Sequence, residues 1–333
     1  MNLDQLLEKS MKPLIMGHQN ADPDAVCSMI AFSRLYNAIN PKGNPTLMAD
    51  DLSRLSKQVL DVFELRDEII EKPSGEYDLV ILLDTNSILQ LGPDFQEMPS
   101  HPSNTVVIDH HEPNPDIATL ADHRIVNSDR FSTCEILVEI FEDLKVKIQP
   151  EIANLLLTGL LFDTRRFFYT DLETLQTGIR LINYGADYER CIKSLQIRPN
   201  RSERIARLKA ASKAHVHLIG DWVLATSTIN AFEASACRGL LEMGADVAII
   251  GGKPEKNVVR LSSRSTREFF DGTNINLGTD VMKPLGEIIN GKGGGHANAA
   301  GANGTKDLNA ALNKAVELIR IAIEGKTSLS NRS

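Results

Sequence analysis

The chain has 333 residues, of which 42% are hydrophobic and 24% are charged, and its formal net charge is −8. This composition is typical of a globular protein and gives enough length for two domains of ordinary size. Proteins that bind long nucleic acids are usually basic overall. The 44 acidic against 36 basic residues therefore argue against a long duplex partner and favour a small or short phosphorylated substrate.

Cysteine spacing and hydropathy exclude further classes. No apolar run reaches the roughly 20 residues that cross a bilayer, and the first twelve residues lack the apolar core of a signal peptide. The cysteines are far apart and form no C-x-x-C pair, so neither a zinc knuckle nor a disulfide framework is expected. We therefore expect a cytoplasmic protein without a membrane partner.

The first predicted strand, residues 12–17, leads into a loop that carries His18, Asp22 and Asp24. Apolar residues at helical spacing follow, so these three side chains lie between a strand and a helix, a position that builds sites in α/β folds. Two carboxylates one residue apart repel each other unless a cation holds them together. A helix N-cap would explain one of the aspartates but not His18 as well.

Two more predicted elements end in an aspartate. The clearest buried strand, residues 78–83, ends at Asp84, which by itself is most simply a cap or turn residue. After a helix at 133–143, a second helix at 150–162 starts with proline and is strongly apolar. Asp163 ends that apolar stretch, a costly position for a carboxylate unless it is paired.

The triplet Asp109-His110-His111 follows a β-branched run at 105–108, which polar and proline residues then stop. Such a short run is typical of a buried parallel strand. Ligands bind beyond the carboxyl ends of such strands, so the triplet lies where chemistry is usually done. A divalent metal or a phosphate would stabilise these charges, whereas a surface turn rich in His and Asp is the alternative for the triplet alone.

The second half of the chain predicts a separate domain. Helices are expected at 171–182 and up to about residue 196, and residues 198–215, rich in Arg, Lys and Ala, predict an exposed linker helix. This linker separates a domain at 1–197 from one at 216–325, and 326–333 resemble a flexible tail. Gly220-Asp221 predicts a hairpin turn. The remaining expected elements are strands at 216–219, 222–226, 247–250 and 258–262 and helices at 234–243, 280–289 and 308–323.

The predicted fold class is therefore α/β, with an N-terminal domain built on a parallel sheet and a smaller C-terminal α/β domain with a mixed sheet. Within the second domain, the glycine-rich stretch 290–296 carries three consecutive glycines between Lys292 and His296. Glycines in series let backbone N–H groups approach an anion, although a flexible turn is the alternative. Three alternating residues on a predicted strand share one face, which forms either a phosphate clamp or an exposed charged face: Arg260, Ser262 and Arg264.

Together these stretches resemble the DHH phosphoesterase superfamily, with its DHH domain and its DHH-associated C-terminal domain. The resemblance covers nearly the whole chain and rests on ordered motifs: His18-x3-Asp22-x-Asp24, Asp84, Asp109-His110-His111, Asp163 in a Thr-Gly-x3-Asp-Thr context, the Arg-x-Ser-x-Arg strand and Gly-Gly-Gly-His. Similar two-domain proteins are nanoRNA- and pAp-degrading phosphoesterases, cyclic-dinucleotide phosphodiesterases and RecJ-like exonucleases. These commonly have Pro-Asp-Gly-Asp where this chain has Ala21-Asp22-Pro23-Asp24, which leaves the subfamily open.

The resemblance implies a site for two divalent metal ions. His18 and Asp22 would hold one ion, and Asp24, His110 and Asp163 the other, with Asp84 as the bridge. Asp109 would orient its neighbours, and His111 would contact the phosphate or assist protonation, so Asp84, Asp109 and His111 are the expected catalytic residues. Carboxylates with imidazoles suit manganese best, with magnesium, cobalt or zinc as alternatives. Two such ions about 3.5–4 Å apart activate water and stabilise phosphoryl charge.

The predicted function is that of a manganese-dependent phosphoesterase that cleaves short oligonucleotides or small nucleotides, such as nanoRNA, pAp or linear and cyclic dinucleotides. The resemblance implies that the second domain binds the substrate through Arg260, Arg264, Gly293, Gly294, Gly295 and His296. A DHH-type inorganic pyrophosphatase shares the metal motifs but lacks the Gly-Gly-Gly-His loop, and a non-catalytic nucleotide-binding protein would have lost ligands. The expected partner is a small nucleotide or a short single-stranded oligonucleotide, and a homodimer is compatible with the sequence.

Overall fold

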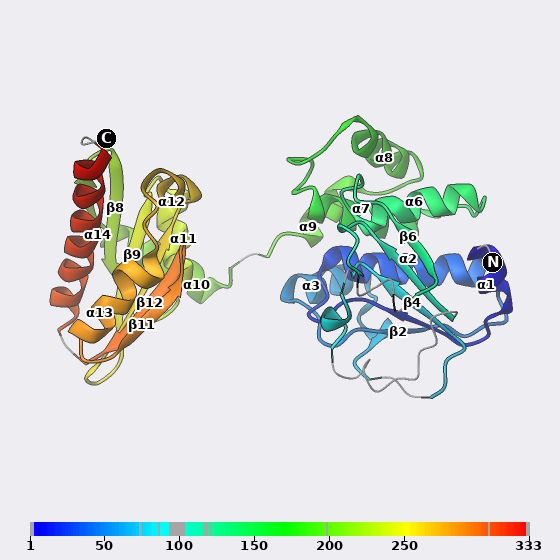
Figure 1. Cartoon of the computed structure of the whole chain (residues 1–333), viewed down its shortest axis with the longest axis horizontal. Coiled ribbons are helices and arrows are strands. Elements are labelled where there is room, and N and C mark those ends of the chain that lie inside the picture. Colours follow the sequence, from blue (N-terminus) through cyan, green and yellow to red (C-terminus); the bar gives the residue numbers. More distant parts are fainter. Residues whose placement is uncertain are drawn as a thin grey trace. The chain divides into compact units, whose positions relative to one another are not determined.

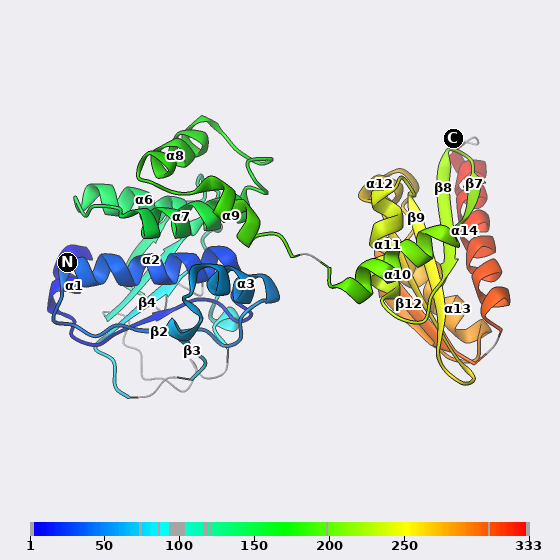
Figure 2. The same ribbon diagram turned by 180° about the vertical axis from the view of Figure 1, so that it is seen from behind.

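The computed structural model describes residues 3–72, 75–85, 87–92, 104–115, 119, 121–197, 199–305 and 307–330. Arg198, the first residue of the predicted linker, and the last three residues of the predicted tail lie outside the described residues. The chain divides into two units, Met1–Ile197 and Arg198–Ser333. Each unit has a sheet of its own, as two opposite views show (Figures 1 and 2). Each also has its own hydrophobic core.

The first unit is built on a parallel sheet. Its six described strands lie in the order β3-β2-β1-β4-β5-β6, and every neighbouring pair is parallel, which confirms the predicted sheet. The strands are β1 (Pro13–Met16), β2 (Thr46–Met48), β3 (Ile69–Ile70), β4 (Leu79–Leu83), β5 (Thr105–Asp109) and β6 (His123–Val126). The order reverses between β1 and β4, and such a switch point is where ligands bind in open α/β sheets.

The main core of the first unit lies between this sheet and its helices. Alternate strand residues such as Ile15, Ile81 and Ile108 pack with helix residues such as Phe32 and Leu156. A smaller apolar cluster, which includes other alternate residues of the same strands, covers the opposite face, as expected for strands buried on both sides. The helices are α1 (Leu3–Lys9), α2 (Pro23–Ile39), α3 (Arg54–Phe63), α6 (Thr133–Asp143), α7 (Pro150–Asp163), α8 (Leu172–Asn183) and α9 (Tyr188–Ser194).

The second unit is built on a mixed sheet. The order of its described strands is β11-β12-β10-β9-β8-β7, with β8 and β9 parallel and the other pairs antiparallel. The predicted hairpin is confirmed, because β7 and β8 pair on either side of Gly220. The strands are β7 (His215–Ile219), β8 (Trp222–Thr228), β9 (Val247–Glu255), β10 (Val258–Ser265), β11 (Lys292–His296) and β12 (Ala299–Gly304).

Helices cover both faces of this sheet. One apolar cluster joins β9 and β10 to helix α14 and to a π-helical segment, and the other joins the opposite face to α10 and α11. The helices are α10 (Arg201–Ser212), α11 (Glu233–Glu242), α12 (Arg267–Thr273), the π-helical segment Leu277–Met282, α13 (Lys283–Ile288) and α14 (Leu308–Ser330).

Two predicted boundary segments differ in the structure. Helix α10, predicted to be an exposed linker, packs against the second sheet and α11 through alanines such as Ala206 and Ala210. Alanines give a weak hydrophobic signal in sequence, yet they allow helices to approach closely. Residues 326–330, predicted to belong to a flexible tail, continue α14 instead. No proline follows Gly325, and a single glycine lowers helix stability by only about 1 kcal/mol.

The glycine-rich stretch is an edge strand rather than a loop, which corrects the sequence prediction. Its residues form β11 and pair antiparallel with β12. A Cβ atom at Gly293 would overlap the carbonyl oxygen of Met282, and one at Gly295 would lie 2.6 Å from the carbonyl oxygen of Ala299. Glycine in a strand often marks such a close backbone approach. Local composition alone did not distinguish this strand from a turn.

Candidate metal centre

Acidic and imidazole side chains converge at the carboxyl-end edge of the first sheet. His18 follows β1, Asp84 follows β4 and His110 follows β5, while α2 and α7 supply the remaining carboxylates. A cavity of about 230 Å³ at this edge is lined by His18, Asp22, Asp84, Gln90, His110, His111 and Asp163. Within the described residues, three overlapping groups could each hold a cation: His18, Asp22 and Asp84; Asp24, Asp84, His110 and Asp163; and Asp84, His110 and His111.

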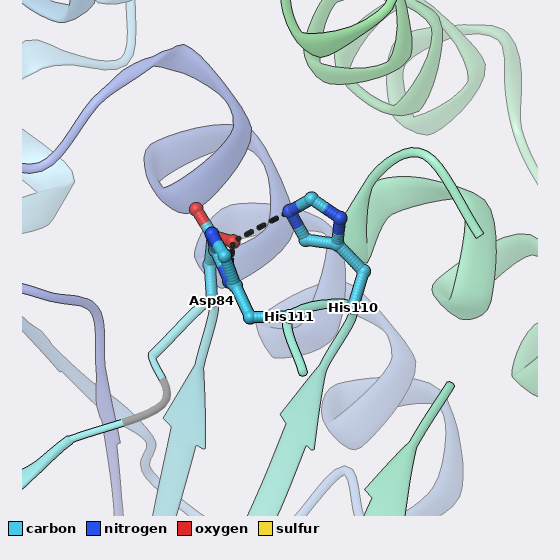
Figure 3. Close-up of side chains that lie close together, drawn as sticks. All are labelled: Asp84, His110 and His111. Carbon is cyan, nitrogen blue, oxygen red and sulfur yellow. Dashed lines mark ion pairs between the residues drawn. The ribbon is translucent and has the colours of Figure 1, made fainter. Parts of the chain in front are cut away.

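Asp84 lies at the centre of these groups and is only 2% exposed. Its Oδ2 atom is 3.7 Å from Nε2 of His18, whereas its Oδ1 atom is 3.5 Å from Nε2 of His110 and 3.8 Å from Nδ1 of His111 (Figure 3). The two oxygens of one carboxylate therefore face different histidines. The backbone at Asp84 has φ of +56°, a left-handed conformation that aspartate tolerates better than most residues.

Asp24 is fully buried at the start of α2, and the first turn of α6 holds its carboxylate. The backbone N–H groups of Thr133 and Cys134 donate to its two oxygens at 2.7 and 3.2 Å, and the Thr133 hydroxyl donates to Asp84 at 3.1 Å. Burial, together with the charges of Asp84 and Asp163, raises the pKa of the Asp24 carboxyl well above its ordinary value. The sequence prediction treated Thr133 only as a helix start and missed these contacts.

Glycine at position 159 makes room for this buried carboxylate. A Cβ atom there would lie 2.5 Å from Oδ1 of Asp24 and would also overlap the sulfur of Cys134. Helix α7 can therefore approach α2 closely only because residue 159 has no side chain. This contact gives a physical reason for the glycine of the Thr-Gly-x3-Asp-Thr pattern, which comes four residues before Asp163.

His18 and Asp22 form one side of the site. Nδ1 of His18 donates to the carbonyl oxygen of Gln19 at 2.8 Å, so its Nε2 atom faces the carboxylates. Metal-binding histidines typically donate their second nitrogen to a carbonyl or carboxylate in this way. Asp22 caps α2 with Oδ1, so the N-cap interpretation applies to this aspartate, but it does not account for the histidine beside it.

His110 has the surroundings that best fit a cation site. Among the described residues, its buried Nε2 atom finds no hydrogen-bond partner of good geometry, although it lies 3.3 Å from Oδ2 of Asp163 and 3.5 Å from Oδ1 of Asp84. Burial opposes the charged imidazole, but the carboxylates of Asp163, Asp84 and Asp24 outweigh it and raise the pKa of His110 to about 11. For the Asp163 carboxyl, burial acts in the other direction and raises its pKa to about 6. An orphaned nitrogen among hard oxygen donors fits a divalent cation.

Asp109 and His111 stand beside this group. The buried Asp109 carboxylate accepts from the backbone N–H of His110 at 2.9 Å and from Nδ1 of His111 at 2.8 Å. This hydrogen bond to Asp109 is the main cause of the raised pKa of His111. His111 is 42% exposed. Asp109 thus fixes the orientation of His111, whose opposite ring edge remains accessible.

The predicted substrate-binding residues lie in the second unit. Arg260, Ser262 and Arg264 share the half-exposed face of β10, but Arg260 forms a bidentate ion pair with the buried Glu233. Arg264 and His296 both lie opposite Ala299 in the strand register, and residues opposite each other project to the same face of a sheet. They are thus about 10 Å apart, two strand spacings.

The four cysteines are buried free thiols. Within the described residues, every helix is too short or too polar to cross a membrane.

Comparisons with known proteins cover both units. The family model of the DHH family, N-terminal domain, matches residues 12–160, and that of the DHHA1 domain matches residues 230–324. An uncharacterized protein of Methanocaldococcus jannaschii is 30% identical over 316 residues, 94% of either chain. The manganese-dependent inorganic pyrophosphatase of Bacillus subtilis is 32% identical over 158 residues, which are 47% of this chain and 49% of that protein.

A solved structure agrees with this fold. An exopolyphosphatase-related protein from Bacteroides fragilis has a TM-score of 0.61 and 17% sequence identity, and the likeness covers 98% of this chain and 95% of that chain. Because two family models match in order and a relative at 30% identity spans almost the whole length, the chain belongs to the DHH family and is a metal-dependent phosphoesterase.

Proposed function

We propose that this protein is a manganese-dependent phosphoesterase that hydrolyses short oligonucleotides or small nucleotides with two metal ions. The observation that carries the proposal is the position of the Asp84 carboxylate. One of its oxygens faces His18, and the other faces His110. A carboxylate that bridges two cations needs this arrangement, whereas a carboxylate that serves a single cation does not.

The residues divide into two sets around this bridge. His18 and Asp22 would hold one ion, and Asp24, His110 and Asp163 the other. Two bound cations would polarise the phosphoryl group and activate an attacking water. The backbone N–H groups of α6 hold Asp24 in place, so its position does not depend on the cation. We expect the set that contains Asp24 to be rigid before substrate binds.

His111 is the proposed contact to the reacting phosphate. Its Nδ1 atom donates to Asp109, and this hydrogen bond fixes the ring so that the Nε2 edge is directed away from the buried carboxylate. From there Nε2 can donate to a phosphate oxygen or protonate the leaving oxygen as the ester bond breaks. Asp109, which would touch neither metal nor substrate, acts as a positioning residue.

Several observations support manganese and a short substrate. Carboxylates with imidazoles suit manganese, and the pyrophosphatase of Bacillus subtilis, similar to the first unit, is manganese-dependent by name. Pyrophosphate itself is the less favoured substrate, because that similarity covers only 47% of this chain and a DHHA1 model matches the second unit. The net charge of −8 disfavours long strands.

The remaining predictions stay part of this proposal. Arg264 and His296 would bind the substrate from the second unit, together with the edge strand that carries Gly293, Gly294 and Gly295. Arg260 could join them only if its ion pair with Glu233 opened. A cytoplasmic location and a homodimer remain predictions from the sequence.

A substrate panel tests the proposal. The full chain is loaded with manganese and assayed on dinucleotides, five-nucleotide and twenty-nucleotide single strands, pAp, cyclic dinucleotides and pyrophosphate. We expect the two- to five-nucleotide substrates or pAp to give the highest kcat/KM. Exclusive pyrophosphate hydrolysis would replace the proposal with the pyrophosphatase alternative, and a preference for long strands with steep salt dependence would indicate a RecJ-like exonuclease.

A further inference from the structure

The turn that follows α7 has an unusual backbone. Arg165, Arg166 and Phe167 have φ values of +48°, +62° and +64°, so three successive non-glycine residues adopt the left-handed conformation. This conformation is unfavourable for residues with a Cβ atom, and glycine adopts it freely. Strain of this kind clusters at ligand sites when the surrounding structure enforces it. The turn begins two residues after Asp163, a candidate metal ligand.

The surrounding structure does enforce this turn. The backbone N–H of Arg166 donates to the carbonyl oxygen of Leu161 at 2.7 Å, and that of Phe167 donates to the Thr164 hydroxyl at 3.0 Å. The Phe167 ring lies against Gly178 of α8, where a Cβ atom would be 2.7 Å from the ring. These contacts hold the backbone and involve neither guanidinium, so the fold does not require arginine at positions 165 and 166.

Both guanidinium groups are available to a ligand. Arg165 and Arg166 are exposed, and within the described part of the chain neither side chain has a hydrogen-bonded or ion-paired partner. Arg165 only lies over the ring of Tyr169, with 5.2 Å between its Cζ atom and the ring centroid. Other arginines of this unit, such as Arg130 and Arg180, are paired with glutamates.

The two arginines line a cavity of about 290 Å³ together with four apolar residues, which we call the arginine pocket: Leu55, Leu161, Phe162, Leu195, Arg165 and Arg166. Two residues that line the pocket are linked to the metal centre, one along the chain and the other through one hydrogen bond. Phe162 directly precedes Asp163. Leu55 precedes Ser56, whose hydroxyl donates at 2.7 Å to the carbonyl oxygen of Ala21, the residue before Asp22.

We propose that the arginine pocket binds one nucleotide unit of the substrate, with its base on the apolar floor and its phosphate or base acceptors on Arg165 and Arg166. Guanidinium groups offer only hydrogen-bond donors, match phosphate oxygens and stack on flat rings. The volume lies just below the range of pockets that hold a whole ligand, so a single base fits better than a dinucleotide. This inference rests on the proposed function, since it assigns part of that substrate.

Glycine substitution separates binding from folding at this turn. Arg165→Gly and Arg166→Gly remove the guanidinium and also relieve the left-handed strain. We expect KM for a 5′-phosphorylated dinucleotide to rise about tenfold in each variant, the scale of one charge-assisted hydrogen bond. The loss on bis-nitrophenyl phosphate, which has no nucleotide unit, is expected to be smaller. The melting temperature should stay unchanged or rise by up to about 2–4 °C.

Lys145→Gly is a matched control, because Lys145 is also an exposed cation with positive φ, +55°, directly after a helix. The Lys145→Gly variant should show the same change in melting temperature as the arginine variants, but its KM should be unchanged. Calorimetric binding of AMP to the manganese-loaded full chain gives a second readout that needs no turnover, and both arginine variants should bind AMP about tenfold more weakly than the wild type.

Two results would overturn the arginine pocket. One is an unchanged KM and AMP affinity in both arginine variants; the other is a lower melting temperature with equal losses on both substrates, which indicates a structural role. A wild type that binds AMP in the pocket yet hydrolyses no phosphoester would instead overturn the proposed function. The two failures are therefore distinguishable.

Discussion

The candidate metal centre of the first unit and the glycine–arginine strands of the second (β10 and β11) are equally conspicuous in the sequence, but their side chains have different surroundings. Around Asp84, several carboxylates lie close to one another and to the imidazole of His110 in a cluster that could hold a cation. In the second unit, Glu233 neutralises Arg260, and Gly293 is explained by its contact with Met282.

The difference lies in what the fold itself satisfies. Burying like charges close together is unfavourable, so a bound cation would stabilise the first region. In the second region, Arg260 and Gly293 already have a structural reason, whereas within the described residues Arg264 has no hydrogen-bonded or ion-paired partner and a Cβ atom at Gly294 would meet nothing. Buried charged groups that the fold does not fully compensate are thus a stronger indicator of a ligand site than residue type alone.

The largest effect is expected for Asp84→Asn. Asparagine also tolerates the left-handed backbone, so the fold should persist while one bridging oxygen is replaced. We expect phosphoesterase activity to fall about a thousandfold or more and bound manganese to decrease. Chelation of the wild type should have the same effect, and added manganese should reverse it.

Elemental analysis and kinetics check this prediction, with Asp51→Asn as the control. Asp51 also has positive φ, +69°, but pairs with Lys57 on the surface, so its amide variant should keep full activity. Full activity of the chelated wild type would contradict the metal requirement, and full activity of Asp84→Asn would contradict the bridging role.

Gly159→Ala tests whether close helix packing maintains the metal centre. The new Cβ would overlap Oδ1 of Asp24 and the sulfur of Cys134, so we expect about 1–3 kcal/mol of destabilisation together with weaker manganese binding. Denaturant unfolding and metal titration measure both. Gly239→Ala in α11, where the nearest atom is 3.5 Å away, should not destabilise the protein. A stable Gly159→Ala variant with normal manganese affinity would show that Asp24 can move without consequence.

Arg264→Ala and Arg260→Ala separate a free arginine from a paired one. Arg264 has no partner in the described residues, so its loss should reduce dinucleotide turnover about tenfold with little change in stability. Arg260→Ala leaves Glu233, 5% exposed, without its partner, so we expect a lower melting temperature as its main effect. Kinetics and thermal unfolding of both variants measure these effects. If Arg260 were the substrate contact instead, Arg260→Ala would reduce turnover and Arg264→Ala would not.

The smallest effect is expected for Gly294→Ala. Nothing lies within 4 Å of a Cβ atom at this position, whereas the same change at Gly293 overlaps Met282. Gly294→Ala should therefore alter stability by no more than about 0.5 kcal/mol, and Gly293→Ala should be clearly destabilising. If Gly294→Ala nevertheless weakens dinucleotide binding, the substrate approaches this edge strand; unchanged binding would limit the contact to Arg264 and His296.

Local patterns in the sequence were sufficient for the parallel and mixed character of the two sheets and for the side chains gathered around Asp84, but not for every strand: β2, β3, β6 and β12 were not predicted, and β11 was predicted to be a loop. A polar residue after a short apolar run shows where each strand ends. Because the carboxyl ends of parallel strands lie at the same edge of a sheet, His18, Asp84 and His110 had to come close. Their metal-binding role remains a prediction.

Only the tertiary structure decided which neighbours each of these groups has. Thr133 holds Asp24 from 109 residues away, and Glu233 pairs with Arg260 across 27 residues. The left-handed turn at Arg165 and Arg166 is likewise set by α7, Thr164 and α8 rather than by its own composition. Local propensity describes a residue and its near neighbours in sequence, whereas partners and enforced strain depend on which segments pack together.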